Sequence, residues 1–218
     1  MDLQTLQSHL MGLVRTHGCL RDISHFNRVW RNAQLIAEDY PEADRMVLLV
    51  ASYLHDIDFT PKDSPLRPQG SRIAAKKTVK ILEEMGGFSK SAISSVAHAI
   101  EAHNPSAGIS AETLEAKIIQ DADRLDMLGA MGIIRNFMYA GRVGNRAYCE
   151  EDPLAKNRDP DETLFAIDHY PQKLFGLANM MNTQKAHEIA ENRINFMHGF
   201  LAQIMREVGP LDGDGPPV

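Results

Sequence analysis

Residues 45–57 read Arg-Met-Val-Leu-Leu-Val-Ala-Ser-Tyr-Leu-His-Asp-Ile, an apolar run that ends in a histidine and a carboxylate. The segment from Met46 to Leu54 is apolar on nearly every side, and a helix of this kind is surrounded by other helices. The adjacent His55 and Asp56 are therefore expected inside the molecule. A buried carboxylate without a partner is costly, and a divalent cation would remove that cost. The run predicts a core helix that leads directly into a metal site.

The composition is that of an ordinary globular chain. It has 218 residues, of which 44% are hydrophobic and 24% are charged, and this length suffices to bury a full core. The formal net charge of −6 opposes the positive field that non-specific nucleic-acid binding requires, so no nucleic acid polymer is expected as a partner. A small phosphorylated metabolite is compatible with this charge, because local Arg and Lys residues suffice to hold it.

Neither a membrane nor an oxidising compartment is predicted. No basic segment followed by an apolar stretch opens the chain, and no run approaches the roughly 18 apolar residues that a membrane span requires. The two cysteines, Cys19 and Cys149, lie in no close CxxC or CxxH arrangement and fit unpaired thiols in a reducing cytosol. We therefore expect a cytoplasmic protein without a membrane partner, while the sequence does not determine the oligomeric state.

Helical periodicity extends over most of the chain, which predicts an all-α fold. The expected helices are residues 3–16, Ser24 to before Pro41, Glu42 to His55, Ser71–Met85, Ser89–His103, one long helix from residues 110–112 to Phe137, and Thr183–Val208. Gly129 and Gly132 in the long helix indicate a close contact or a bend. We expect one domain over residues 1–208, with a metal-binding core at about 24–138, an irregular acidic stretch at 141–168, C-terminal helices at 169–208 and a disordered tail at 209–218.

Two further candidate ligands are distant in sequence from His55 and Asp56. His25 precedes His55 by thirty positions, in the first turn of its helix, where spacing alone also fits a capping or solvated residue. Asp121 and Asp123 differ by two positions and so project about 200° apart on a helix, which means that only one of them can face a given ion. The candidates follow the order H…HD…D.

This order of motifs resembles the HD superfamily of metal-dependent phosphohydrolases. Four segments are similar to small bacterial HD hydrolases: His25-Phe-Asn-Arg-Val, His98-Ala-Ile-Glu-Ala-His103, Thr113-Leu-Glu-Ala-Lys-Ile and the helix from Asp121 to Arg135. The resemblance implies an HD-domain helical bundle with additional C-terminal helices. It also implies one divalent metal ion held by His25, His55, Asp56 and Asp123, because the family's Ala-Asp-Arg pattern selects Asp123.

The resemblance implies a phosphohydrolase that uses a metal-activated water to cleave a phosphate ester or anhydride of a small metabolite, with a nucleotide as the expected substrate. Two imidazoles and two carboxylates suit Mn²⁺, Fe²⁺, Co²⁺, Ni²⁺ or Zn²⁺, and Mg²⁺ binds such a site more weakly. Arg28, Arg67 and Arg124 are candidates to hold the phosphate. Arg28 fits a surface salt bridge equally well.

The chain departs from better characterised HD branches at the residue three places after the motif aspartate. Guanosine-alarmone hydrolases and nucleoside 5′-monophosphatases carry glutamate there, whereas this chain has Phe59. Those two activities are therefore not expected. Asp58 and His103 are the candidates for proton transfer in place of that glutamate, although Asp58 also fits a simple turn residue.

Two other functions stay open. One is a dinuclear iron oxygenase of the HD type, which needs about two more histidine ligands, and His98, His103 and His169 are the supply. The other is a non-enzymatic, metal-dependent nucleotide sensor. Metal counting distinguishes the first from the phosphohydrolase, and turnover on nucleotides distinguishes the second.

Overall fold

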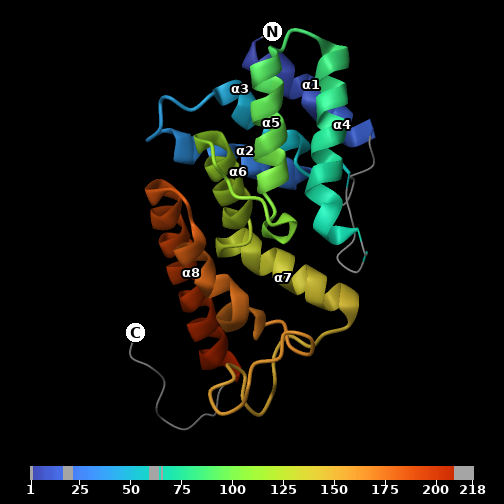
Figure 1. Cartoon of the computed structure of the whole chain (residues 1–218). Coiled ribbons are helices and arrows are strands. Elements are labelled where there is room, and N and C mark those ends of the chain that lie inside the picture. The colour runs from blue at the N-terminus through green and yellow to red at the C-terminus, as the bar shows by residue number, and fades with distance from the viewer. Residues whose placement is uncertain (1, 17–21, 59–63, 65, 209–218) are drawn as a thin grey trace. The chain divides into compact units, whose positions relative to one another are not determined.

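The computed structural model (Figure 1) describes residues 2–16, 22–58, 64 and 66–208, with the side chains of Arg67 and Ser106 also outside the description. Cys19, Phe59 and the predicted tail at 209–218 lie outside the described residues. The described residues form eight α-helices and four short 3-10 or π segments. Their one β feature is an isolated bridge between Arg146 and Phe165. The predicted all-α fold is confirmed.

The chain forms two compact units, Met1–Leu125 and Asp126–Val218. All of the candidate metal ligands belong to the first unit. The prediction of one domain over residues 1–208 stays a prediction.

The first unit is built around α3 (Arg45–Leu54), which contacts each of the other five α-helices of the unit. These are α1 (Leu3–Thr16), α2 (Ile23–Ala37), α4 (Gly70–Met85), α5 (Lys90–Ala102) and α6 (Leu114–Leu125), with 3-10 turns η1 (Arg67–Gln69) and η2 (Pro105–Ala107). Figure 1 shows α4 and α5 side by side. Every residue from Val47 to Leu54 is buried, as the apolar run predicts.

Helix α3 begins three residues later than the sequence analysis expects. The Asp44 side chain accepts hydrogen bonds from the backbone N–H groups of Met46 and Val47 (2.8 and 3.2 Å) and so caps the helix. A carboxylate that satisfies these otherwise unpaired N–H groups fixes the helix start. The start near Glu42 is therefore wrong, and the helix ends at Leu54 with His55 as its C-cap, one residue before the predicted end.

The predicted long helix from residues 110–112 to Phe137 is wrong, because the chain breaks it into α6 and α7 (Gly129–Val143). Gly129 adopts a φ of +71°, a conformation that side chains with a Cβ rarely adopt. A Cβ at Gly132 would collide with the carbonyl oxygen of Met127. The two glycines therefore permit a tight turn, and the longest helix among the described residues is α8 (Gln184–Val208).

The second unit packs α7 against α8, where the rings of Phe137 and Phe200 lie 6.2 Å apart. A π-helical turn, η3 (Tyr170–Leu174), and a 3-10 turn, η4 (Phe175–Met180), precede α8. Between α7 and η3 the chain is irregular and is held by a buried ion pair. Asp168, whose side chain is fully buried, accepts a 2.8 Å hydrogen bond from Arg158 Nη2. Free Cys149 is buried in the same stretch.

Candidate metal centre

Three helices of the first unit end at the candidate site. His55 is the C-cap of α3, His103 is the C-cap of α5, and Asp123 lies in the last turn of α6. The last carbonyls of a helix have no N–H partner within the helix and carry partial negative charge. Three such helix ends at one site create a negative potential, which favours a cation independently of the side-chain ligands. His25 joins it from the first turn of α2, where the Asp22 side chain accepts from the His25 N–H (3.1 Å).

His55 presents an unprotonated Nε2 atom to this site. His55 Nδ1 lies 3.0 Å from the carbonyl oxygen of Ser52, and because a carbonyl only accepts, Nδ1 carries the proton and Nε2 keeps its lone pair. Complete burial lowers the pKa of His55 to about 4, so the imidazole is neutral at pH 7. His103 Nδ1 likewise donates to the carbonyl of Ile100 (2.7 Å). A neutral imidazole held in this tautomer, as at His55, is the form that binds a metal ion.

A first group of donors consists of His25, His55 and Asp123. The two Nε2 atoms lie 3.1 Å apart, and Asp123 Oδ1 is 3.4 Å from that of His25 and 3.8 Å from that of His55. Donors about 2.1 Å from one ion are about 3.0 Å apart at right angles and about 3.4 Å apart at tetrahedral angles. The Nε2 of His55 carries a lone pair. A second ring nitrogen 3.1 Å away is therefore favourable only if His25 donates a proton to that lone pair or if a cation binds both nitrogens. The three donors fit one divalent ion.

A second group consists of His55, Asp56 and His103, whose ligand atoms also lie within 4.8 Å of one another. His103 Nε2 is 3.7 Å from Asp56 Oδ1, and the rings of His55 and His103 have centroids 4.9 Å apart. His55 belongs to both groups, but one Nε2 lone pair binds one ion. The four predicted ligands therefore divide, with Asp56 placed beside His103 and the other three placed together.

The arginines predicted to hold a phosphate differ in their surroundings. Arg124 is 8% exposed, and its Nη1 lies 3.8 Å from the wholly buried Asp121. Burial lowers the pKa of Arg124, while Asp121 and Asp123 raise it, so the guanidinium lies among the carboxylates of α6. Arg28 instead donates to Asp22 (2.8 Å) and to Ser24 (2.6 Å) in the first turn of α2. The Arg67 side chain lies outside the described residues.

The candidate proton donor Asp58 is exposed and lies 3.4 Å from Lys77 Nζ on α4. The sequence does not indicate this pair, because Lys77 lies on α4, nineteen positions after Asp58. Among the three additional histidines, His98 Nε2 accepts a hydrogen bond from the Glu112 N–H (3.1 Å). His169 is paired with Glu162 in the second unit. Only His103 belongs to a donor group.

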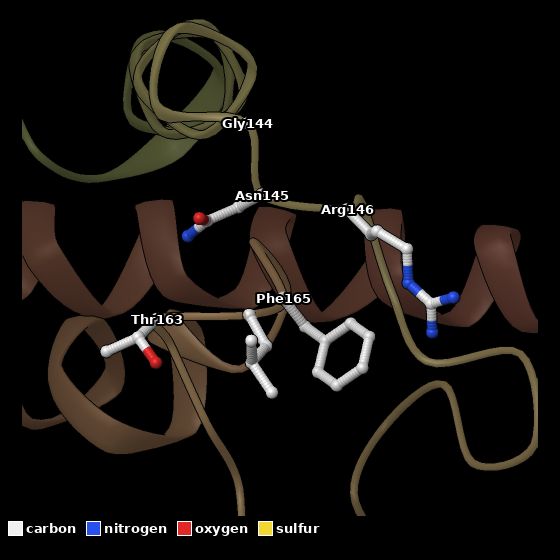
Figure 2. A pocket seen from close by; sticks show the side chains of 6 residues that line it. Gly144, Asn145, Arg146, Thr163 and Phe165 are labelled. Atoms are coloured by element: carbon white, nitrogen blue, oxygen red, sulfur yellow. The ribbon is translucent and has the colours of Figure 1, made fainter.

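A hollow of about 260 Å³ in the second unit is lined by residues 144–146 and 163–165 (Figure 2). Its lining contains no His, Cys, Asp or Glu. The Asn145 amide donates to the Glu162 carbonyl (3.0 Å), and the Thr163 hydroxyl donates to Asp161 (2.6 Å). Arg146 lies over the ring of Phe165, as Figure 2 shows. The hollow offers no imidazole, thiol or carboxylate donor, and both donor groups found among the described residues lie in the first unit.

The comparisons with known proteins identify related sequences and structures. Residues 22–128 match the model of the HD domain family. The YpgQ protein of Bacillus subtilis is 40% identical over 102 residues, a match that spans 47% of this chain and 44% of YpgQ. The crystal structure of YpgQ in complex with ADP superposes with a TM-score of 0.72 at 29% identity, over 98% of this chain and 100% of YpgQ. A second YpgQ crystal structure is 30% identical over the same shares of the two chains. An HD-superfamily hydrolase from Bacillus thuringiensis superposes at 0.71 with 29% identity, over 94% of this chain and 98% of that one.

The chain belongs to the HD domain family. Its fold and its His and Asp donor groups support a metal-dependent hydrolase. Among the described residues, no helix combines the length and the apolar character needed to cross a membrane.

Proposed function

We propose that this protein is a metal-dependent phosphohydrolase that cleaves a phosphate ester or anhydride of a small metabolite, namely a nucleotide. The observation that carries the proposal is the convergence of the His25 and His55 Nε2 atoms and the Asp123 carboxylate, with His55 held neutral by burial. A bound divalent ion would act there as a Lewis acid toward the phosphoryl group and would activate the attacking water. The ion is Mn²⁺, Fe²⁺, Co²⁺, Ni²⁺ or Zn²⁺, since imidazole and carboxylate donors suit these, with Mg²⁺ weaker.

The chain would supply the metal ligands from three separate segments. His25, His55 and Asp123 would bind the ion, and Asp56 would complete the set from the side of His103. His55 needs no proton loss to bind, because its lone pair already faces the site. The helix ends of α3, α5 and α6 add negative potential that opposes loss of the cation.

The nucleotide substrate is supported by the relative YpgQ, which was crystallised in complex with ADP. A cationic side chain beside the metal centre would help to hold the phosphate. Arg124 fits this role best among the described arginines, because it is next to Asp123 in sequence and its pKa responds to that carboxylate. The Arg28 guanidinium is already occupied by Asp22 and Ser24, so its use would require those bonds to break.

Proton transfer to the leaving group is assigned to Asp58, two residues after Asp56. Its exposed carboxylate lies 3.4 Å from Lys77 Nζ. Losing a positioned general acid typically costs about 10²- to 10⁴-fold. We expect Asp58→Asn to slow hydrolysis of alkyl phosphates, which need the proton, and to spare both p-nitrophenyl phosphate and metal content. Equal wild-type rates on both substrates in Asp58→Asn would reduce Asp58 to a turn residue and make His103 the next candidate.

The test of the function is a turnover screen of the metal-stripped protein reloaded separately with Mn²⁺, Co²⁺, Ni²⁺, Zn²⁺ and Mg²⁺. Nucleoside mono-, di- and triphosphates are the substrates, and released phosphate and pyrophosphate are measured separately. We expect metal-dependent turnover that His55→Ala abolishes and that His98→Ala, a histidine in neither donor group, retains. Metal binding without turnover on any phosphate would instead support a nucleotide sensor.

The dinuclear iron oxygenase is a second candidate because His103 lies beside Asp56, where a second ion would need ligands. The described residues offer only this one extra histidine, whereas two are required. Two irons per chain together with consumption of dioxygen would replace the phosphohydrolase with this activity.

A further inference from the structure

Two buried side-chain amides reach the ends of the helices that carry the candidate ligands. Asn32 on α2 is 4% exposed, and Gln120 on α6 is 7% exposed. A buried amide N–H group that lost its acceptor would be left without water to replace it, so the acceptor that each amide finds is held firmly. Both acceptors are backbone carbonyls in the last turn of a helix.

The first amide fixes the segment of Asp123. Asn32 Nδ2 donates to the carbonyl oxygen of Ala122 at 2.9 Å, across ninety positions of sequence. Ala122 is the residue immediately before Asp123. Asn32 also follows His25 by seven positions, which is two helical turns, so both lie on the same face of α2. The bond therefore ties the helix that carries one ligand to the backbone that carries another.

The second amide fixes the segment of His103. Gln120 Nε2 donates to the carbonyl oxygen of Ala102 at 2.8 Å, and Ala102 immediately precedes His103. Gln120 is itself three residues before Asp123, one turn earlier on α6. The two hydrogen bonds thus connect α2 to α6 and α6 to α5. In each bond the accepting carbonyl belongs to the residue immediately before a candidate metal ligand.

We propose that Asn32 and Gln120 are positioning residues of the metal centre, which set the separation of the donors on α2, α6 and α5. The proposal rests on the proposed metal site and adds two residues that act on the ligands through the backbone of α6 and α5. A metal ion requires its donors within a few tenths of an ångström of the ideal distances. A change in the angle between two helices at their ends is enough to exceed that tolerance, and the two amides resist such a change.

The test uses Asn32→Leu and Gln120→Met, which keep the approximate size of each side chain and remove its hydrogen-bond donors. Asn136→Leu is the matched control, because Asn136 Nδ2 donates to the Ala166 carbonyl at 2.8 Å in the second unit. Each full-length variant is stripped of metal, its melting temperature is measured, and it is then titrated with Mn²⁺ by electron paramagnetic resonance and with Co²⁺ by visible absorption. If Asn32→Leu does not fold, Asn32→Ala replaces it.

We expect all three variants to melt below the wild type in the metal-free state, since the two site variants each lose a buried hydrogen bond and Asn136→Leu loses a part-buried one. Mn²⁺ affinity should fall about 10- to 100-fold in the two site variants, the usual cost of removing a group that orients a ligand. Their Co²⁺ spectra should also change. Asn136→Leu should keep wild-type affinity and spectrum despite its lower melting temperature.

Wild-type affinity and Co²⁺ spectra in both site variants would overturn the positioning role while leaving the metal site intact. A wild-type protein that binds neither Mn²⁺ nor Co²⁺ would overturn the metal site and this proposal together. The two failures are therefore distinguishable in one set of titrations.

Discussion

The neutrality of His55 makes the stability of the metal-free protein depend on pH in a defined window. Burial lowers the pKa of folded His55 to about 4, whereas an unfolded histidine titrates near 6.5. Between these values the unfolded chain binds a proton that the folded chain does not, so stability is fully present above about pH 6.5 and is lost as pH falls through about 4. Each pH unit in this window costs up to about 1.4 kcal/mol, and the loss from pH 7 to pH 4 is about 3 kcal/mol.

Urea unfolding of the protein in the presence of a chelator, at half-unit steps from pH 7 to pH 4, measures this loss. Carboxylates also titrate at the acid end, so the informative quantity is the difference between the wild type and His55→Gln. We expect the unfolding free energy of His55→Gln to fall by about 3 kcal/mol less over the same range. His187→Gln is the matched control, because His187 Nδ1 also donates to a carbonyl, that of Ala178 (2.9 Å), but its side chain is 35% exposed.

The reasoning is refuted if His55→Gln and the wild type lose stability in parallel between pH 6.5 and pH 5. That outcome would mean that folded His55 takes up its proton like a solvated histidine. The Nε2 lone pair would then bind a proton in the folded protein and would not be available to a cation.

Other predictions concern the metal and the second unit. A chelator should lower the melting temperature by about 5–10 °C. An ion present at 100 times its Kd adds about 2.7 kcal/mol of stability, and each kcal/mol raises the melting temperature by about 2–4 °C at this chain length. An unchanged melting curve after verified metal removal would contradict this prediction. Asp123→Ala should purify without metal and Asp121→Ala with it, and the reverse result by elemental analysis would identify Asp121 as the ligand. Asp168→Asn should lower the unfolding free energy measured in urea by about 2–4 kcal/mol, because it leaves Arg158 without its buried partner. Glu162→Gln, which breaks a more exposed pair, should cost under about 1 kcal/mol, and equal losses in the two variants would argue against the buried ion pair.

The features that sequence predicts well are those that one segment determines by itself. The apolar run of α3 specifies a surrounded helix regardless of its neighbours, and it ends where the charged pair begins. His55 is therefore placed correctly inside the first unit at the helix terminus, whereas the prediction that Asp56 also lies inside is wrong, because its side chain is 36% exposed. The order of the four motifs then indicates the family, because separate segments with fixed spacing rarely arise by chance.

The features that sequence does not predict depend on contacts between segments. The Asn32 amide finds the Ala122 carbonyl only when α2 and α6 pack together, and neither residue differs in sequence from an ordinary helical position. The same holds for Asp58 and Lys77. The division of the donors into two groups is also a tertiary property, since it depends on which side of His55 each helix end approaches.

The break between α6 and α7 is an intermediate case. Helical periodicity continues through residues 126–128, so the pattern alone predicts one helix. Gly129 supplies the positive φ that allows the chain to turn, but a glycine in a helical pattern is also tolerated without a break. The choice between these outcomes depends on packing that the pattern does not contain.

The metal centre itself is tested most directly by anomalous X-ray diffraction from crystals of the protein grown with Mn²⁺, with data collected on both sides of the manganese absorption edge. We predict one strong anomalous peak about 2.1–2.3 Å from the Nε2 atoms of His25 and His55 and from a carboxylate oxygen of Asp123. A peak bound by Asp56 and His103 without His25, or no peak at these donors while Mn²⁺ is bound elsewhere, would contradict the account.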